Sequence, residues 1–323
     1  MRFGLAYVLV LAWGVGVALG GLGPLLVPAV AFIGIPLADA IVGEDRAAPT
    51  GRRALHDALL RLWVPTQLAL IAAACWLAPQ TTPAAGVALA IGLGVVTGGG
   101  GITIAHELLH RRAALDRGLA EALMTSVSYP WFCVEHVYGH HRWVGTPRDP
   151  ATSRRGESVF TFVPRSVFGG FVSFLRIEAE RGPARPLRYA LTTALTWSAA
   201  YALGGLPGLA VFAGQAALAV GLLEAINYIE HYGLRRTPNA AGSYGAVTPR
   251  HSWNSDHAVS GAFLFQLPRH ADHHAHAARA FDELVSREDA PTLPYGYPTL
   301  VLVAMVPPLW FRLMDPRVDA LAG

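Results

Sequence analysis

Residues 84–112 read AAGVALAIGLGVVTGGGGITIAHELLHRR, and the fold of the whole chain can be approached from this stretch. Residues 84–105 carry no charged side chain, and their number is close to the roughly 20 apolar residues that a helix needs to cross a bilayer. The run ends directly in HELLH, residues 106–110, which two arginines follow. The stretch therefore predicts a membrane-spanning helix that presents two histidines and a glutamate where it leaves the membrane.

The composition of the rest of the chain is that of an integral membrane protein. Of its 323 residues, 53% are hydrophobic and 15% are charged, whereas about 25% are charged in a typical soluble domain. The formal net charge is +3 and the arginines are scattered, so no nucleic-acid partner is predicted. The two cysteines, Cys75 and Cys133, lie far apart and suggest neither a disulfide framework nor a cysteine metal site.

Six apolar runs are predicted to be transmembrane helices that pair into three hairpins. The connectors within the hairpins, GGLG, PQTTP and GGLPG, are uncharged, whereas arginines such as Arg46, Arg53 and Arg111 lie between the hairpins. By the positive-inside rule both termini and the segments 106–186 and 228–323 face the cytoplasm. The predicted spans are residues 3–20, 22–42, 58–78, 84–105, 187–204 and 206–227.

The first run is interpreted as a retained helix, because no polar cleavage region follows it as in a signal peptide. Two shorter or proline-containing apolar stretches, residues 118–134 and 298–311, are predicted to be interfacial or re-entrant. Together these features predict an all-α integral membrane protein with residues 1–323 in a single membrane-embedded domain. A histidine-rich cap is expected on its cytoplasmic side.

Most of the 13 histidines follow a spacing that indicates a metal site. The pattern is H-x3-H, then H-x3-HH, then a lone histidine after the sixth span, then H-x2-HH. Residues i and i+3 or i+4 share a helix face, so each cluster can offer two or more imidazoles to a common point. Burying so many imidazoles without a ligand to bind would be costly. The histidines concerned are His106, His110, His136, His140, His141, His231, His270, His273 and His274.

The number of histidines argues for two metal ions. HELLH alone fits the zinc-protease pattern, in which Glu107 would be the general base. A catalytic zinc needs only about three protein ligands, so eight or nine histidines suit two ions with open positions. Imidazole ligation is compatible with Zn, Cu, Fe or Ni and does not select iron. A membrane zinc metalloprotease stays a remote alternative. So does a metal-binding transporter, although the spans hold almost none of the ionisable residues that transporters use.

The histidine spacing resembles that of the integral-membrane di-iron desaturase and hydroxylase superfamily. More specifically, the segments EHVYGHHRWVGTPRDPATSRRGES, NYIEHYGL, HSWNSDH and LPRHADHHAHAARAF resemble motifs of the bacterial alkane 1-monooxygenases. NYIEHYG discriminates best, because fatty-acyl desaturases share the histidine clusters but generally lack it. PLADAIVGEDR and the C-terminal LPYGYPTLVLVAMVPPLWFRLMDPRV extend the likeness over most of the chain.

This resemblance implies that the nine histidines hold two irons, which use O2 to hydroxylate n-alkanes to 1-alkanols. Electrons are expected from rubredoxin, reduced by its reductase, on the cytoplasmic side of the bacterial inner membrane. The chain has no CxxC pair and no nucleotide-binding glycine motif, so no directly bound flavin or NAD is predicted. No separate protein acid or base is assigned. A xylene-type aryl-methyl monooxygenase and a fatty-acyl desaturase or hydroxylase stay open as alternatives.

Carboxylates beside the ligands are expected to offset the charge of two divalent ions and to orient the imidazole rings. The candidates are Glu107, Glu135, Glu230 and Asp272, with Asp149 and Glu157 as weaker ones. His257, in the motif HSWNSDH, is a further candidate for such a supporting role, and His251 shares that motif. His276 is not expected to be a ligand, and His56 is expected to be a solvated loop residue.

The substrate and the electron carrier leave weaker traces in the sequence. An alkane has no polar group, so an apolar tunnel open to lipid is expected, and Trp13, Trp63 and Trp76 are large enough to block it. The glycines at 98–101 would let a backbone or a bound chain approach closely. Either an acidic electron carrier or lipid head groups would account for the arginines at 148, 154, 155, 235 and 236.

Overall fold

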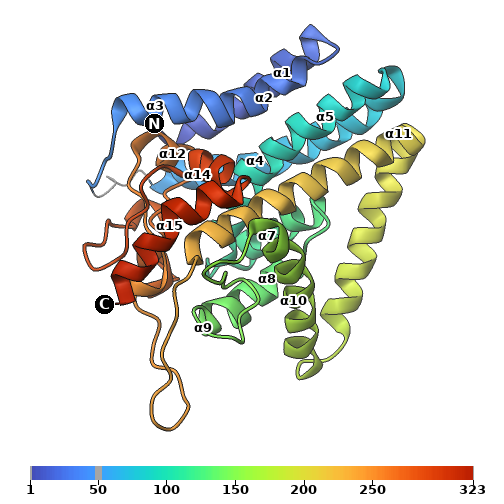
Figure 1. The fold of residues 1–323 in the computed structure, drawn as a ribbon. Helices are drawn as coiled ribbons and strands as arrows, with labels where there is room; N and C mark the ends of the chain where they lie inside the picture. The colour runs from blue at the N-terminus through green and yellow to red at the C-terminus, as the bar shows by residue number, and fades with distance from the viewer. Residues whose placement is uncertain (1, 48–52, 323) are drawn as a thin grey trace.

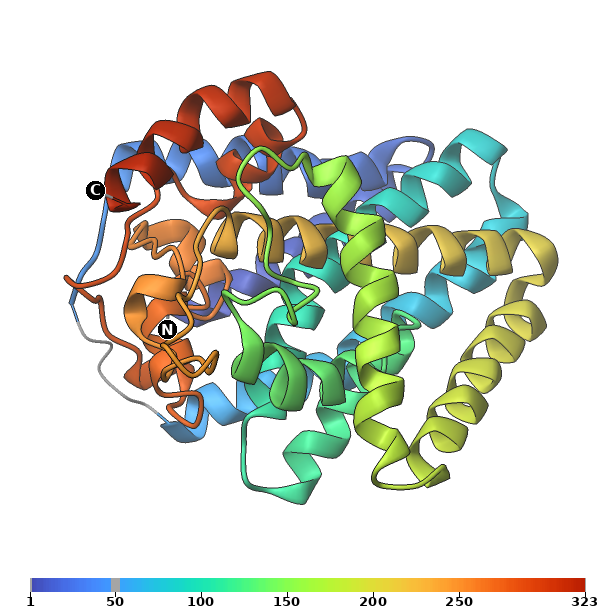
Figure 2. The same cartoon turned by 60° about the horizontal axis from the view of Figure 1, so that its bottom comes forward.

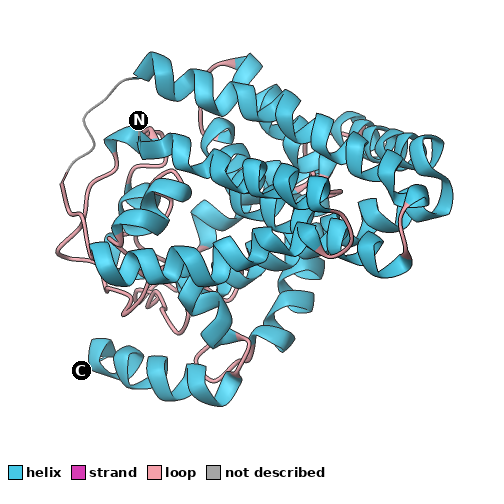
Figure 3. Ribbon diagram, turned by 90° about the horizontal axis from the view of Figure 1, so that it is seen from above, coloured by secondary structure: helices cyan, strands magenta, loops and turns pink. Residues whose placement is uncertain are grey.

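The computed structural model describes residues 2–47 and 53–322, and the described residues form helices and loops without a β-strand. Long helices lie side by side, and the loops gather mainly at the end that holds both termini (Figure 3). The main helices are α1 (Tyr7–Leu19), α2 (Leu26–Ala29), α3 (Ile35–Val42), α4 (Arg53–Leu77), α5 (Pro83–Val96), α6 (Thr103–Leu109), α7 (Ala114–Ser126), α8 (Phe132–Glu135), α9 (His141–Trp143), α10 (Val159–Ala179), α11 (Ala184–His231), α12 (Ala258–Phe263), α13 (His270–Ala275), α14 (Tyr297–Ala304) and α15 (Pro307–Ala322).

Three π-helical turns join some of these helices into longer rods. They are Val30–Gly34 between α2 and α3, Thr97–Ile102 between α5 and α6, and His136–His140 between α8 and α9. A π-helical turn inserts a residue into an α-helix and changes the face on which the later side chains lie. Two of the three turns lie directly before or within the histidine clusters, so they affect how the histidines are presented.

Five helical segments are long and apolar enough to cross a membrane, and a sixth arises if α14 and α15 count as one bent span. The chain is thus a multi-pass membrane protein, as predicted. The first four predicted spans each coincide with one of these segments, with shifted ends. The five segments are Arg2–Leu19, Gly23–Val42, Arg53–Gln80, Pro83–Leu109 and Ala184–His231.

The fifth and sixth predicted spans are the two limbs of α11. Its backbone leaves the helical region at Gly204 and Gly205, and the chain reverses direction there (Figure 1). Gly205 has φ +58°, and a Cβ on Gly204 would overlap the carbonyl oxygen of Cys75 on α4. Glycine is required at Gly205 because of its positive φ and at Gly204 because a side chain would not fit there. The second limb runs to His231 rather than to residue 227, so this histidine sits on the helix itself.

The two stretches predicted to be interfacial or re-entrant are both broken. Residues 118–134 cover the end of α7, a turn in which Ser128 has φ +58°, and the start of α8. Residues 298–311 cover α14 and the start of α15, which meet at an angle of 120°. Neither stretch forms one straight helix.

The glycines at 98–101 bring neighbouring helices close to the π-helical turn that precedes α6. A Cβ on Gly98 would lie 3.0 Å from the Cα atom of Ala219 on α11. A Cβ on Gly100 would overlap the ring of Trp63, and a Cβ on Gly101 would overlap the side chain of Gln67. The expected close approach to a neighbouring backbone is therefore confirmed, and much of the space is filled by α4 side chains.

The hairpin of α1 and α2 provides a test of such packing. A Cβ on Gly16 would overlap the backbone of Gly23, whereas a Cβ on Gly14 of the same helix would meet no atom within 4 Å. Gly16→Ala is expected to destabilise the protein by about 1–3 kcal/mol, because overpacking forces the backbones apart. The measurement is the midpoint of heat denaturation in detergent. Gly14→Ala is the matched control, and equal losses in both variants would contradict the packing.

Candidate metal centre

The nine histidines of the sequence pattern meet at one place although they come from four parts of the chain. α6 and the residue after it carry His106 and His110, and the second limb of α11 ends in His231. The turn from α8 to α9 and the short helix α13 carry the other six. Figure 2 shows the segments around α8, α9, α13 and the end of α11 lying together.

Potential ligand atoms of these histidines form two compact groups, and within each group they all lie within 4.8 Å of one another. We refer to them as the five-histidine group and the four-histidine group. The five-histidine group is His106, His110, His136, His141 and His273. The four-histidine group is His140, His231, His270 and His274.

The helical turns explain this division, which differs from what i, i+4 spacing alone predicts. His136 and His140 are four residues apart, yet they belong to different groups. The π-helical turn His136–His140 instead brings His136 to His141, with their Nε2 atoms 3.0 Å apart. On α13 the i, i+4 pair His270 and His274 shares a group as expected.

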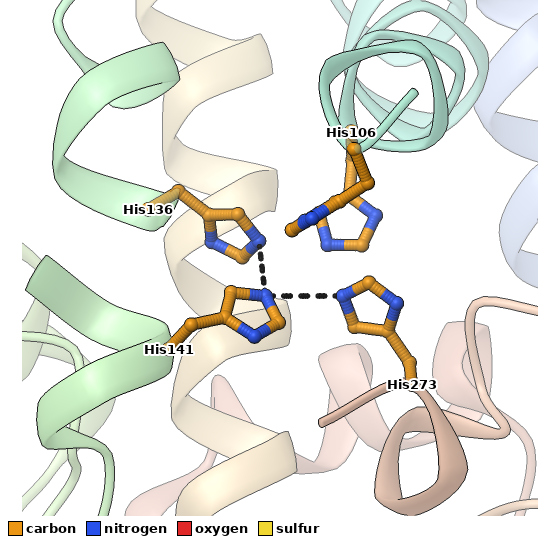
Figure 4. A group of neighbouring side chains, drawn as sticks. His106, His136, His141 and His273 are labelled. Carbon is orange, nitrogen blue, oxygen red and sulfur yellow. Dashed lines mark hydrogen bonds between the residues drawn. The ribbon is translucent and has the colours of Figure 1, made fainter. Parts of the chain in front are cut away.

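The geometry within each group fits a bound metal ion. Two nitrogens bound at right angles to an ion at about 2.1 Å lie about 3.0 Å apart. The Nε2 atom of His141 lies 3.0 Å from that of His136 and 3.1 Å from that of His273 (Figure 4). In the four-histidine group, the Nε2 atom of His274 lies 3.0 Å from that of His270.

Unpaired nitrogens strengthen this fit. Among the described residues, the Nε2 atoms of His106, His110 and His231 are buried and have no hydrogen-bond partner. Buried polar atoms without a partner are rare in proteins and costly. A metal ion in each group would bind these lone pairs.

Burial keeps most of these imidazoles in the neutral form that binds metals. It lowers the pKa of His110 to about 4 and holds the pKa of His136, His141 and His273 well below the ordinary value. Nearby histidines add to the effect in each case. His140 is different: burial acts to lower its pKa, but the carboxylates of Asp149, Glu135 and Glu230 together raise it.

Two ligand candidates have clear partners on the side of the ring away from the metal position. His140 Nδ1 lies 3.0 Å from Asp149 Oδ2, which also accepts a hydrogen bond of 2.6 Å from Thr152. His231 Nδ1 lies 3.2 Å from the backbone oxygen of His251. Such contacts fix the tautomer and the orientation of a metal-binding imidazole.

Three of the other predicted carboxylates hold surrounding loops rather than ligand rings. Glu107 accepts hydrogen bonds from Arg111 and from the backbone nitrogen of Phe281. Asp272 accepts them from Arg279 and from the backbone of residue 285. Glu157 forms an ion pair with Arg165 at 2.7 Å.

Glu135 and Glu230 lie closer to the ligands. Glu135 is fully buried in a small cavity that His136 and His140 also line, and burial raises its pKa to about 8. Glu230 places Oε2 3.1 Å from the Nε2 atom of His270.

The remaining histidines lie outside both groups. The expectation for His56 was wrong, because it is buried and its Nδ1 lies 2.8 Å from Asp282 Oδ2. His257 contacts the hydroxyl of Ser255 at 2.9 Å, and His276 contacts Asp272 at 3.2 Å.

Sequence reasoning missed two buried residues of the site. Glu224, inside a predicted span, accepts a 2.9 Å hydrogen bond from Tyr129 and lines the cavity that holds Glu135. An ionisable residue in a span is itself a signal of function and could have been used. Arg269 is fully buried and donates to the backbone oxygens of residues 45, 47 and 284, which anchors the start of α13. Its distant partners could not be read from the sequence.

A small apolar chamber with an accessible volume of about 60 Å³ lies among α1, α3, α5, α11, α12 and α14. Leu9, Val95 and Phe263 are among its lining residues. Ile226 on α11 lines both this chamber and a second cavity, whose wall includes His106, His136 and His270. An apolar space thus lies next to the two histidine groups.

None of the three tryptophans considered as tunnel blocks lines this chamber. Trp63 is buried and donates a hydrogen bond to Gln67. Trp76 is 56% exposed, and Trp13 is buried elsewhere in the core.

Known proteins are similar to this chain over most of its length. The family described as fatty acid desaturase matches residues 80–302. An alkane 1-monooxygenase of Acinetobacter baylyi is 38% identical over 93% of this chain and 77% of its own length. Alkane 1-monooxygenase 2 of Pseudomonas aeruginosa is 37% identical over 95% of this chain and 87% of its own.

The chain belongs to the alkane 1-monooxygenase family. It is therefore an enzyme of the desaturase and hydroxylase superfamily, as the histidine motifs predicted. The xylene/toluene monooxygenase hydroxylase component XylM of Pseudomonas putida is 30% identical over 66% of this chain. The similarity to the alkane 1-monooxygenases is both higher in identity and longer.

The contact between Asp149 and His140 allows a test of the four-histidine group. Asp149→Asn is expected to weaken metal binding about 10–100-fold, because the ring loses a charged partner that orients it. The measurement is competition for the metal against a chelator of known affinity. The control is Asp116→Asn, since Asp116 is also buried but pairs with Arg61 instead of a histidine. Unchanged affinity in Asp149→Asn would exclude this role.

Proposed function

We propose that the protein hydroxylates the terminal carbon of n-alkanes at a di-iron centre held by the two histidine groups. The observation that carries this proposal is the apolar chamber that shares Ile226 with a second cavity, whose wall contains histidines of both groups. The reaction consumes the alkane, O2, two electrons and two protons, and it yields a 1-alkanol and water. When bound, the di-iron centre would supply the O2 activation that attack on an unactivated C–H bond requires.

The protein's own contribution is binding, orientation and exclusion of water. An alkane offers no hydrogen-bonding group, so its affinity and position depend on apolar area and shape alone. The chamber has side chains such as Leu9, Phe263 and Val301 for this purpose. A chain lying in it with one end past Ile226 would present its terminal carbon beside His106 and His270.

We extend the proposal to the electron donor, a reduced rubredoxin, since the described residues contain no second redox motif. A surface groove beside the site is lined by Arg148, Arg154, Arg235 and Arg236, four of the five arginines noted in the sequence. The fifth, Arg155, pairs with Asp319. Asp149 also lines the groove and contacts His140, so an acidic carrier docked there would lie close to the four-histidine group.

The arginine distribution supports a location in the bacterial inner membrane with the site on the cytoplasmic side. Arginines are concentrated in the segments between the hairpins, which carry the histidines. Rubredoxin and its reductase would then reach the groove from the cytoplasm. The whole chain would act as a single membrane-embedded domain.

The direct test supplies rubredoxin, its reductase and NADH to the purified protein and offers octane, hexadecane and p-xylene. The expected products are 1-octanol or 1-hexadecanol, and the expected metal content is about two irons per chain. Omission of rubredoxin is the control and should abolish turnover. Oxidation of p-xylene alone would move the substrate to the aryl-methyl class, and a single zinc per chain would refute the di-iron proposal.

The chamber predicts how chain length can be altered. Ala31→Leu adds bulk to the chamber wall and is expected to lower turnover of the longest accepted alkane about tenfold or more, while shorter alkanes are retained. Competition between alkanes of different length measures the shift. Ala40→Leu makes the same change at an exposed position of α3 and should leave the preference unchanged. Equal shifts in both variants would argue against the chamber as the binding site.

A further inference from the structure

The two histidine groups are unequal in the number of donors they offer. One offers five imidazoles and the other four, although both lie in the same buried region. A carboxylate would complete the smaller group and would also offset part of the metal charge. A carboxylate in this role would contact a nitrogen that faces a metal position.

Glu230 makes this contact. Its Oε2 atom lies 3.1 Å from His270 Nε2, and the same nitrogen lies 3.0 Å from His274 Nε2. Ligand atoms at right angles around an ion at about 2.1 Å are about 3.0 Å apart. The distance from Glu230 Oε2 to His270 Nε2 thus nearly equals that between neighbouring ligands, although Glu230 lies outside the set of atoms that are all within 4.8 Å of one another.

Tyr297 fixes the other half of this carboxylate. The hydroxyl of Tyr297 donates a 2.9 Å hydrogen bond to Glu230 Oε1, which leaves Oε2 turned toward His270. The side chain of Glu230 is only 2% exposed, and in residues 2–47 and 53–322 no arginine pairs with it. A buried carboxylate without a cation is costly, and a metal ion would supply the missing charge.

The other acidic side chains near the ligands are used differently. Glu107 and Asp272 are held by arginines and by backbone nitrogens. Asp149 contacts His140 through Nδ1, on the outer side of the ring. Of these carboxylates, only that of Glu230 contacts an Nε2 atom of the four-histidine group.

We propose that Glu230 is a direct ligand of the metal ion in the four-histidine group. The proposal rests on metal occupancy as described under the proposed function. It makes the two ions chemically unequal, since one has five nitrogen donors and the other has four nitrogens and an oxygen. Glu230 also lines the cavity that contains Ile226, so the oxygen-ligated ion is next to the expected position of the substrate's end.

The test compares Glu230→Gln with the unmodified protein after loading both with ⁵⁷Fe. Glutamine keeps the shape but removes the charge and weakens the donor. One of the two irons is expected to be released to a chelator at least about tenfold faster, and the other at the original rate. The Mössbauer spectrum should change for half of the iron.

Two further variants separate ligation from general damage. Glu107→Gln alters another buried glutamate one residue from a histidine, and it should release both irons at the original rate. Tyr297→Phe removes the hydrogen bond but keeps the carboxylate, so it should retain both irons and alter the same half of the spectrum less than Glu230→Gln does.

The outcomes distinguish this inference from the proposed function. Two irons with an unchanged release rate and spectrum in Glu230→Gln would overturn the role of Glu230 and leave the di-iron proposal intact. Equal iron loss in Glu230→Gln and Glu107→Gln would also overturn it. If the unmodified protein binds no iron, the proposed function fails first, and chelator release of bound Co²⁺ or Zn²⁺ then tests Glu230 alone.

Discussion

Burying nitrogen lone pairs at one end of an apolar helix bundle is costly, and the rest of the structure has to hold the histidines in this position. Imidazoles can satisfy one another only in part, because a lone pair facing a lone pair gives no hydrogen bond. The buried Nε2 atoms of His106, His110 and His231 have no hydrogen-bond partner. The surrounding structure holds these atoms in place at a cost in folding free energy, which binding of a metal ion would offset. Stability and function are therefore tied to the same atoms.

The features that hold the histidines in place come from distant parts of the chain. The fully buried guanidinium of Arg269 joins the start of α13 to the loop that follows α3. The backbone nitrogen of Trp253 donates a hydrogen bond to the backbone oxygen of Glu230, and this bond caps the end of α11. These contacts fix two ligand-bearing helix ends without any charge–charge contact with the imidazoles themselves.

The sequence was sufficient for the hairpins and for the set of histidines that come together, because both rest on local composition and spacing. It was insufficient for the division of those histidines. The π-helical turn at His136–His140 has no sequence signal of its own, and it moves His140 away from His136. It was also insufficient for His56, whose partner Asp282 is far away in the chain. Long-range pairs of this kind depend on how helices pack, which spacing does not encode.

The short segments that carry the ligands have a consequence for both histidine groups. α13 spans only His270–Ala275, and it contributes to both histidine groups, as does the turn at His136–His141. A shift in the backbone of α13 or of this turn would therefore displace ligand candidates of both groups at once.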